Sequence, residues 1–252
     1  MSGHSKWATI KRQKGANDAK RGQLFTKLSK AITIAVRQGG NVSDPESNFR
    51  LRLAVEAARA ANMPKENIER AISRAAGKEA GDLNEVLYEG FGPGGFSVIV
   101  ESLTDNKQRT VSEVKNIFDK NGGSMGSQGS VQYQFAKKGM ISVAKNDKSL
   151  DDIFLLAADY QAEDIEDAGE EVLIYTKPED LALVRNGLIE QGLNVKVAEL
   201  TWEPIVMHAI NDKVMAEKAL NFVGKMEDLD DVQKVYANFD IPEEIIQPQD
   251  EE

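Results

Sequence analysis

Apolar side chains in the first third of the chain recur at spacings of three and four residues, the pattern of a helix that buries one face. Glycine, proline and short polar residues stand at the ends of these stretches, where helices begin and stop. The pattern therefore predicts a small three-helix domain over residues 1–78. Its helices are expected from Asp18 to Gly39, from Pro45 with Asp44 as the N-cap, and from Pro64 to Gly77.

Beyond residue 90 the period changes, because short alternating runs of apolar and polar residues are separated by helical stretches. The expected helices are Arg109–Lys120, Leu150–Ala158, Pro178–Gln191 and Asp212–Met226. The expected strands are Phe96–Glu101, Val131–Phe135, Met140–Val143, Asp164–Asp167, Val172–Thr176, Val195–Trp202, Ile205–Ile210 and Val232–Phe239. The middle of this series has the order β-α-β-β-α-β, which is that of a ferredoxin-like domain.

The elements on either side of this middle domain form two further β-α-β units. If these two units pair, they build a second ferredoxin-like sheet into which the middle domain is inserted. The sequence thus predicts an α+β protein with an N-terminal three-helix domain and two ferredoxin-like α/β domains, one inserted in the other. The expected divisions are 1–78 for the helical domain, 79–136 with 205–245 for the split α/β domain, 137–204 for the inserted domain, and 246–252 for an acidic tail.

Charge is distributed unevenly along the 252 residues. The formal net charge is −10, yet residues 1–78 contain 16 Lys and Arg against 6 Asp and Glu, which leaves 15 basic and 35 acidic residues for 79–252. A basic segment on an acidic body indicates that the first third meets a polyanion, while the acidic α/β domains resist nonspecific contact and can meet protein partners. The alternative is a charge imbalance that serves no partner.

The basic segment consists of an arm and the first helix. An arm of cations and glycines with one indole can follow phosphates and stack on a base. On the helix, four basic residues share an arc that points away from the apolar stripe, and Asp18 is the only acidic residue among residues 1–40. A solvated lysine face is the alternative. The candidate nucleic-acid contacts are Lys6, Trp7, Lys11, Arg12 and Lys14 in the arm, and Lys20, Arg21, Lys27, Lys30 and Arg37 on the helix.

These residues leave the kind of nucleic acid open. A single tryptophan in a basic arm suits single-stranded or structured RNA. The second and third helices, joined by Asn62-Met63-Pro64, also have the order of a helix-turn-helix, which would direct four side chains toward a major groove: Lys65, Asn67, Arg70 and Arg74.

Enzymatic chemistry has little support in the sequence. There is no cysteine, and the two histidines, His4 and His208, are too far apart to suggest a histidine metal site. Gly90–Gly95 has the spacing GxGxxG, but a strand follows where a dinucleotide site needs a helix N-terminus. Gly122–Gly126 has the spacing GxSxG, but it leads from helix to strand rather than from strand to helix. We therefore expect no catalytic residue, no cofactor and no metal.

Membrane insertion and export are not expected either. No apolar run approaches the length of a membrane span, and the polar first residues are not followed by an apolar segment. The simplest expectation is a cytoplasmic protein without membrane contact.

Six stretches together resemble the YebC/PmpR family, and the resemblance spans almost the whole chain. They are Gly3–Lys11, Asp18–Lys27, Asn62–Lys65, Tyr88–Gly95, Thr104–Thr110 and Asp228–Phe239. The resemblance implies three domains, a helical N-terminal one and two α/β domains with the third inserted in the second. It also implies a role that is not enzymatic.

Two activities are implied by this resemblance. Bacterial members are generally described as DNA-binding transcriptional regulators. Other members, including the mitochondrial translational activator of cytochrome oxidase, look like ribosome-associated, rRNA-binding factors that relieve elongation stalls such as those at consecutive prolines. We expect a DNA-binding transcriptional regulator, with the translation factor as the alternative. The contacts implied for this chain lie between Lys6 and Lys30, with a second candidate surface at Asn106, Lys107 and Arg109.

Overall fold

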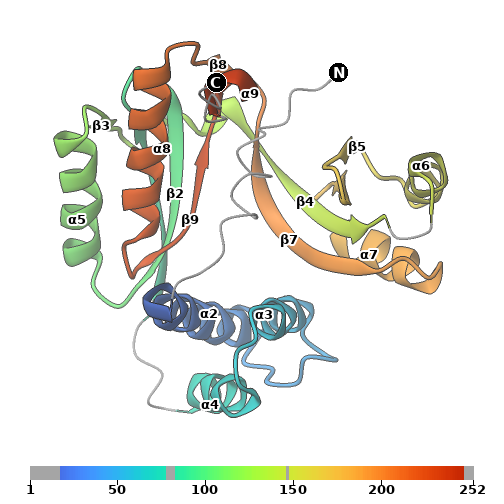
Figure 1. The fold of residues 1–252 in the computed structure, drawn as a ribbon. Coiled ribbons are helices and arrows are strands. Elements are labelled where there is room, and N and C mark those ends of the chain that lie inside the picture. Colours follow the sequence, from blue (N-terminus) through green and yellow to red (C-terminus); the bar gives the residue numbers. More distant parts are fainter. Residues whose placement is uncertain (1–17, 78–82, 146–147, 247–252) are drawn as a thin grey trace. The chain divides into compact units, whose positions relative to one another are not determined.

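The computed structural model describes residues 18–77, 83–145 and 148–246 (Figure 1). The chain divides into two compact units. The first unit comprises Met1–Ile34, Glu79–Ala136 and Pro204–Glu252, and the second comprises Ala35–Lys78 and Lys137–Glu203. The helical N-terminal region and the antiparallel sheets confirm the predicted α+β class, while the predicted boundaries of three domains stay a prediction.

The three N-terminal helices are α2 (Asp18–Gln38), α3 (Phe49–Ala60) and α4 (Lys65–Ala76). The chain leaves α2 through Gly40, whose φ of +74° is the left-handed conformation that glycine adopts without strain. The prediction that the second helix begins at Pro45 is wrong. Asp44 caps a separate turn, in which its carboxylate accepts hydrogen bonds from Glu46 N and the Ser47 hydroxyl. The N-cap of α3 is instead Asn48, whose side chain accepts from Leu51 N at 3.1 Å.

Helix α3 packs on the core of the second unit. Phe49 and Leu53 contact its main apolar cluster, and Glu56 pairs with the buried guanidinium of Arg185 at 2.5 Å. The side-chain amide of Asn48 also donates to Ala35 O and Val42 O, at 3.0 Å each, and ties the start of α3 to the end of α2. Burial and these polar contacts make α3 part of this unit's core.

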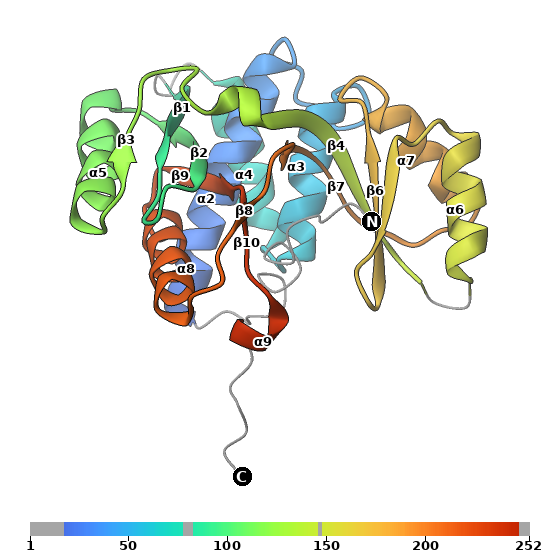
Figure 2. The same ribbon diagram turned by 90° about the horizontal axis from the view of Figure 1, so that it is seen from above.

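The sheet of the second unit has the strand order β5-β6-β4-β7. Both β4 and β5 run antiparallel to β6. Apolar residues of α6 (Leu150–Asp159) and α7 (Leu181–Glu190) cover one face of this sheet, and Figure 2 shows the two helices beside it. The predicted order β-α-β-β-α-β of the inserted domain is therefore confirmed. Its elements are β4 (Phe135–Ala144), α6 (Leu150–Asp159), β5 (Asp164–Asp167), β6 (Glu171–Thr176), α7 (Leu181–Glu190) and β7 (Val195–Pro204).

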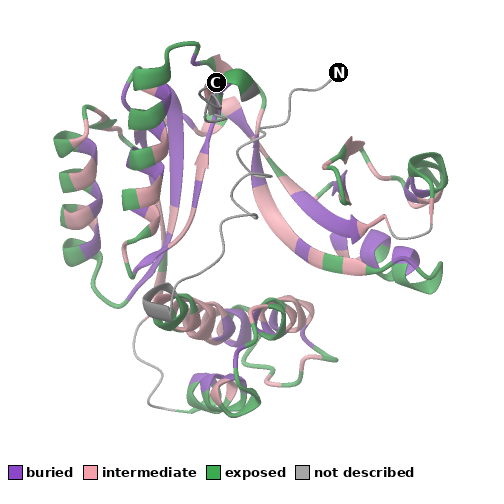
Figure 3. Cartoon of the chain, in the orientation of Figure 1, coloured by how far each residue is buried: buried purple, intermediate pink, exposed green. Residues whose placement is uncertain are grey.

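The first unit has a second antiparallel sheet, of order β3-β1-β2-β9. Helices α5 and α8 cover one face of it, and Figure 3 shows that β2 is buried along most of its length while both helices expose their outer sides. Phe96, Phe118 and Phe222 are fully buried in this core. The main elements are β1 (Asn84–Phe91), β2 (Ser97–Thr104), α5 (Lys107–Lys120), β3 (Ser124–Met125), α8 (Lys213–Glu227) and β9 (Val232–Ala237).

The strands of this sheet differ in part from those expected. Residues 131–134 do not form the expected strand, because Val131 N and Gln132 N donate to the buried carboxylate of Glu89 at 2.9 Å each, and Gln132–Gln134 is a 3₁₀ helix, η1, after which Phe135 begins β4. The expected strand Ile205–Ile210 is reduced to β8 (His208–Ala209), which pairs in parallel with β10 (Phe239–Asp240). A last short helix, α9, spans Glu243–Ile246.

Strand β1 was not expected at all. It forms an antiparallel hairpin with β2, turned by Gly94 and Gly95 at φ of +85° and +90°. Gly90 lies within β1, where a Cβ would stand 2.5 Å from Ser124 O of the neighbouring strand. The glycines of this GxGxxG stretch are therefore explained by a hairpin turn and a close backbone approach.

Candidate nucleic-acid interface

The predicted contact residues fall into three groups in the structure. Lys6, Trp7, Lys11, Arg12 and Lys14 lie outside the described residues, as does the side chain of Lys20. Arg21 is exposed on α2, whereas Lys27 and Lys30 are half-buried in the first unit. Arg37 is half-buried near the other end of α2, in the second unit. The basic residues that the helical arc grouped together thus have different surroundings along α2.

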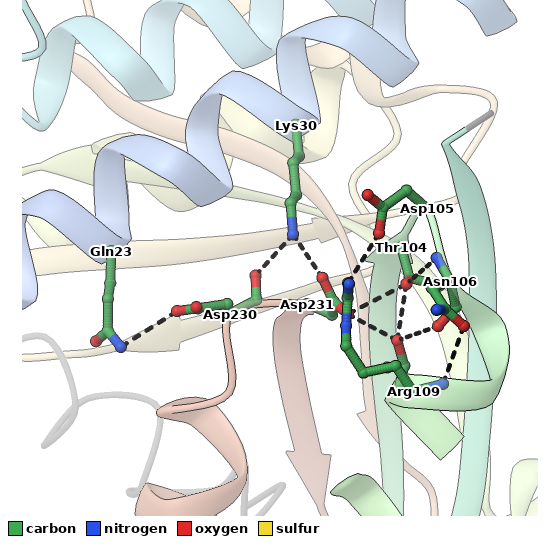
Figure 4. A network of polar contacts seen from close by, with 9 residues as sticks. Gln23, Lys30, Thr104, Asp105, Asn106, Arg109, Asp230 and Asp231 are labelled. Carbon is green, nitrogen blue, oxygen red and sulfur yellow. Dashed lines mark hydrogen bonds and ion pairs between the residues drawn. The ribbon is translucent and has the colours of Figure 1, made fainter. Parts of the chain in front are cut away.

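Lys27 and Lys30 contact an acidic turn of the same unit, Glu227–Asp231, at the end of α8. Lys27 Nζ donates to Glu227 O at 2.5 Å. Lys30 Nζ donates to Asp230 O at 3.1 Å and forms an ion pair with Asp231 Oδ1 at 2.6 Å (Figure 4). Both ammonium groups are therefore already bound by oxygen atoms of the protein.

Asp231 is the centre of this polar network. Its side chain is only 3% exposed, and besides Lys30 it accepts from Arg109 Nη2 at 2.7 Å and from the hydroxyls of Thr110 and Thr104 at 2.7 and 3.1 Å. Burial alone would raise the pKa of Asp231, but the hydrogen bonds from Lys30, Arg109 and Thr110 outweigh it and hold the pKa well below its ordinary value. The carboxylate is thus charged, buried and fully surrounded by donors.

The second candidate surface has structural contacts as well. Asn106 is the N-cap of α5, where its side chain accepts from Arg109 N at 3.1 Å. Arg109 bridges Asp231 and Asp105, and its hydrogen bonds to these two carboxylates raise its pKa. Lys107 is exposed beside them. The sequence Thr104–Thr110 therefore builds the helix start that receives Asp231.

Exposed arginines on α3 and α4 form a further set of cations, in the second unit. Arg59, Arg70 and Arg74 form no ion pair or side-chain hydrogen bond within the part of the chain that the structure describes. Glu66, which could have paired with Arg70 four residues later, does not do so there, and the pair formed on α4 is Lys65 with Glu69 at 3.5 Å. These guanidinium groups are available to bind phosphate oxygens.

Sequence reasoning placed Thr104–Thr110 at a candidate surface but missed Asp231 and the buried network that it forms with Thr104 and Thr110. The available signal was that Thr104–Thr110 and Asp228–Phe239 both belong to the stretches that carry the family resemblance. It did not show that the two stretches meet, because Thr110 and Asp231 are 121 residues apart.

The described residues contain neither a cluster of metal-ligating side chains nor a membrane-spanning helix. Among residues 18–77, 83–145 and 148–246, no group of three or more His, Asp or Glu side chains could hold a metal ion. No described helix is long and apolar enough to cross a membrane. Ser124, the serine of the GxSxG stretch, is exposed in the short strand β3 after α5, so this stretch does lead from helix to strand.

Two protein-family models together match most of the chain. Residues 5–78 match the family model described as the TACO1/YebC protein N-terminal domain, and residues 83–239 match the one described as the TACO1/YebC second and third domain. The chain belongs to the TACO1/YebC family, as the resemblance to YebC proteins predicted.

Individual relatives are similar over nearly their full length. A protein of Rubrobacter xylanophilus is 49% identical over 98% of this chain and 98% of its own, and one of Dictyoglomus thermophilum is 50% identical over 98% and 99%. Each is named a probable transcriptional regulatory protein. The crystal structure of a conserved hypothetical protein from Aquifex aeolicus superposes with a TM-score of 0.88 at 46% identity, covering 97% of this chain and 100% of that one.

Proposed function

We propose that this protein is a nucleic-acid-binding regulator of gene expression, and specifically a DNA-binding transcriptional regulator that works in the cytoplasm without catalysis or cofactor. The observation that carries the proposal is the uneven charge of the chain. Residues 1–78 contain 16 basic and 6 acidic residues, whereas residues 79–252 contain 15 basic and 35 acidic residues. The names of the relatives from Rubrobacter and Dictyoglomus support a regulator of transcription.

The contact set that we propose combines the arm with exposed guanidinium groups. Lys11, Arg12 and Lys14 of the arm would bind backbone phosphates, and Arg70 and Arg74 of α4, in the second unit, would each offer a further phosphate contact. Contacts of this kind position a protein on nucleic acid without reading its sequence. Protein partners would meet the acidic α/β domains.

Binding of ribosomal RNA is the second candidate function. It is favoured by Trp7, which stands among the arm's cations, because an indole stacks on unpaired bases more readily than it reads a duplex. In this case the protein would act on translation, as the family resemblance also implies.

A charge-neutralised arm tests the proposed contact. In the full chain, Lys11→Gln/Arg12→Gln/Lys14→Gln should weaken binding to labelled duplex DNA of any sequence by about tenfold or more at low salt. The matched control neutralises three exposed lysines of the acidic domains, Lys115→Gln/Lys196→Gln/Lys213→Gln, and should change the affinity by less than about twofold. Equal effects of the two triple variants would contradict the proposed contact set.

Sedimentation separates the two functions. A transcriptional regulator should be retained on particular duplexes over competitor DNA and migrate free of ribosomes. A translation factor should co-migrate with large ribosomal subunits or whole ribosomes, and the arm should crosslink to ribosomal RNA. Ribosome profiling of a deletion strain gives the matching readout in cells, since codon-specific pausing and promoter-specific transcript loss are distinct outcomes.

A further inference from the structure

The acidic turn Glu227–Asp231 presents its oxygens to one face of α2. Gln23, Lys27 and Lys30 are spaced by four and three residues, so they lie on the same side of the helix. Gln23 Nε2 donates to Asp228 O at 3.4 Å and to Asp230 Oδ1 at 3.3 Å. Together with the two lysines, three successive donors of α2 are bound by this one turn.

The turn carries more negative charge than these contacts require. Four of its five residues are acidic, and it follows α8, whose C-terminal carbonyls add a partial negative charge. Asp231 is buried and has four donors, but Asp228 and Asp230 are exposed. The carboxylate of Asp228 accepts no hydrogen bond within the described residues, and that of Asp230 accepts only the one from Gln23 there.

We propose that this acidic turn is an autoinhibitory contact that competes with nucleic acid for the basic face of α2. The inference rests on the proposed function, since it concerns a polyanion that binds the same helix. The carbonyl and carboxylate oxygens of the turn occupy Lys27 and Lys30 as phosphate oxygens would. The uncompensated carboxylates of Asp228 and Asp230 repel an approaching phosphate backbone.

This arrangement divides the turn into two parts with different roles. Asp231 fixes α2 to the start of α5 through the buried network, so its loss should affect folding. Asp228 and Asp230 contribute charge next to the helix and little to the fold. Removing the charges of Asp228 and Asp230 should therefore strengthen the binding of nucleic acid without unfolding the protein.

The test compares two variants that change the net charge equally. Asp228→Asn/Asp230→Asn removes two charges beside α2, and Asp159→Asn/Glu190→Gln removes two exposed charges from the second unit. Affinity for a labelled duplex DNA of mixed sequence and for a single-stranded RNA of the same length is measured by fluorescence anisotropy. Thermal unfolding of each variant confirms that it is folded.

At about 50 mM salt the turn variant should bind about three- to tenfold more tightly than the wild type, and the control pair should change affinity by less than about twofold. The difference should shrink at about 200 mM salt because the charges are exposed and screened. Equal gains in both pairs, or no gain in the turn variant, would overturn the autoinhibitory contact. If the wild type and both variants bind neither nucleic acid, the proposed function itself fails, and this inference with it.

A second substitution shows whether the competition is for α2. Lys27→Gln should weaken binding more in the Asp228→Asn/Asp230→Asn background than in the wild type, because the loss of two neighbouring negative charges lets a phosphate compete with Glu227 O for the ammonium group. An equal effect in both backgrounds would show that the turn does not compete for Lys27.

Discussion

At the residue scale, the buried carboxylate of Asp231 binds one cation of α2, Lys30, within the protein. Its carboxylate is 3% exposed and accepts from four side chains, one on α2, one at the end of β2 and two on α5. A charge in such a position is stable only while its donors are present. Lys30 therefore has a structural partner, whatever else it binds.

Removing this charge should destabilise the protein. Asp231→Asn removes the buried charged acceptor that Lys30 and Arg109 share, and we expect the free energy of unfolding to fall by about 1–3 kcal/mol. Urea unfolding measures the loss, and Asp228→Asn, at an exposed carboxylate, is the matched control. Equal stability of wild type and Asp231→Asn would contradict the role given to this residue.

The same residue predicts a dependence of stability on pH. Because the pKa of Asp231 is lowered in the folded protein, its stabilising contribution is fully present above the unfolded value of about 3.9 and is lost as the pH falls below it. The difference in unfolding free energy between wild type and Asp231→Asn should be constant between about pH 5 and 7 and shrink below about pH 4. A difference that grows on acidification would have the wrong sign.

At the element scale, the helices and the inserted sheet followed from hydrophobic periodicity, whereas the strands of the first unit did so only in part. The alternation over 131–135 suggested a strand, but the buried carboxylate of Glu89 binds the backbone N–H groups that a strand would need. Conversely, β1 was not predicted because its sequence contains glycines after Tyr88, which are typical of loops. In the structure these glycines allow a close approach of two strands and a tight turn.

Glu89 should therefore be essential to the segment that follows β3. It accepts from the backbone N–H groups of Gly129, Val131 and Gln132, and it is 2% exposed. Glu89→Gln replaces an acceptor oxygen by a donor, and we expect a loss of about 1–3 kcal/mol in unfolding free energy. Hydrogen exchange at these three amides should accelerate more than exchange in α6. Unchanged exchange at all three would contradict this explanation of η1.

The start of α3 gives a second prediction at this scale. Asn48→Ala removes the N-cap, the bond to Ala35 O near the end of α2 and the bond to Val42 O in the loop that follows, so the unfolding free energy should fall by about 1–2 kcal/mol. Asp44→Ala, which affects only the exposed turn before it, should cost less. Thermal unfolding of both variants distinguishes them, and a larger loss for Asp44→Ala would contradict the role given to Asn48.

At the scale of the whole molecule, the uneven charge could be read directly from the sequence, but the pairing of individual cations could not. Lys30 and Asp231 are 201 residues apart, and no local pattern links them. A helical arc predicted only that the basic residues of α2 share a side. The structure adds that Lys27 and Lys30 already contact the acidic turn. It also adds three exposed cations on α3 and α4, Arg59, Arg70 and Arg74, to the candidate contacts.

Cations of the first third of the chain are proposed to bind nucleic-acid phosphates. This binding is tested most directly by the affinity of the full chain for duplex DNA and for ribosomal RNA at a series of salt concentrations. If about six phosphates are bound, a plot of log K against log salt should have a slope of about −5 for duplex DNA and a somewhat shallower one for a single strand. A slope near zero for both would contradict the account.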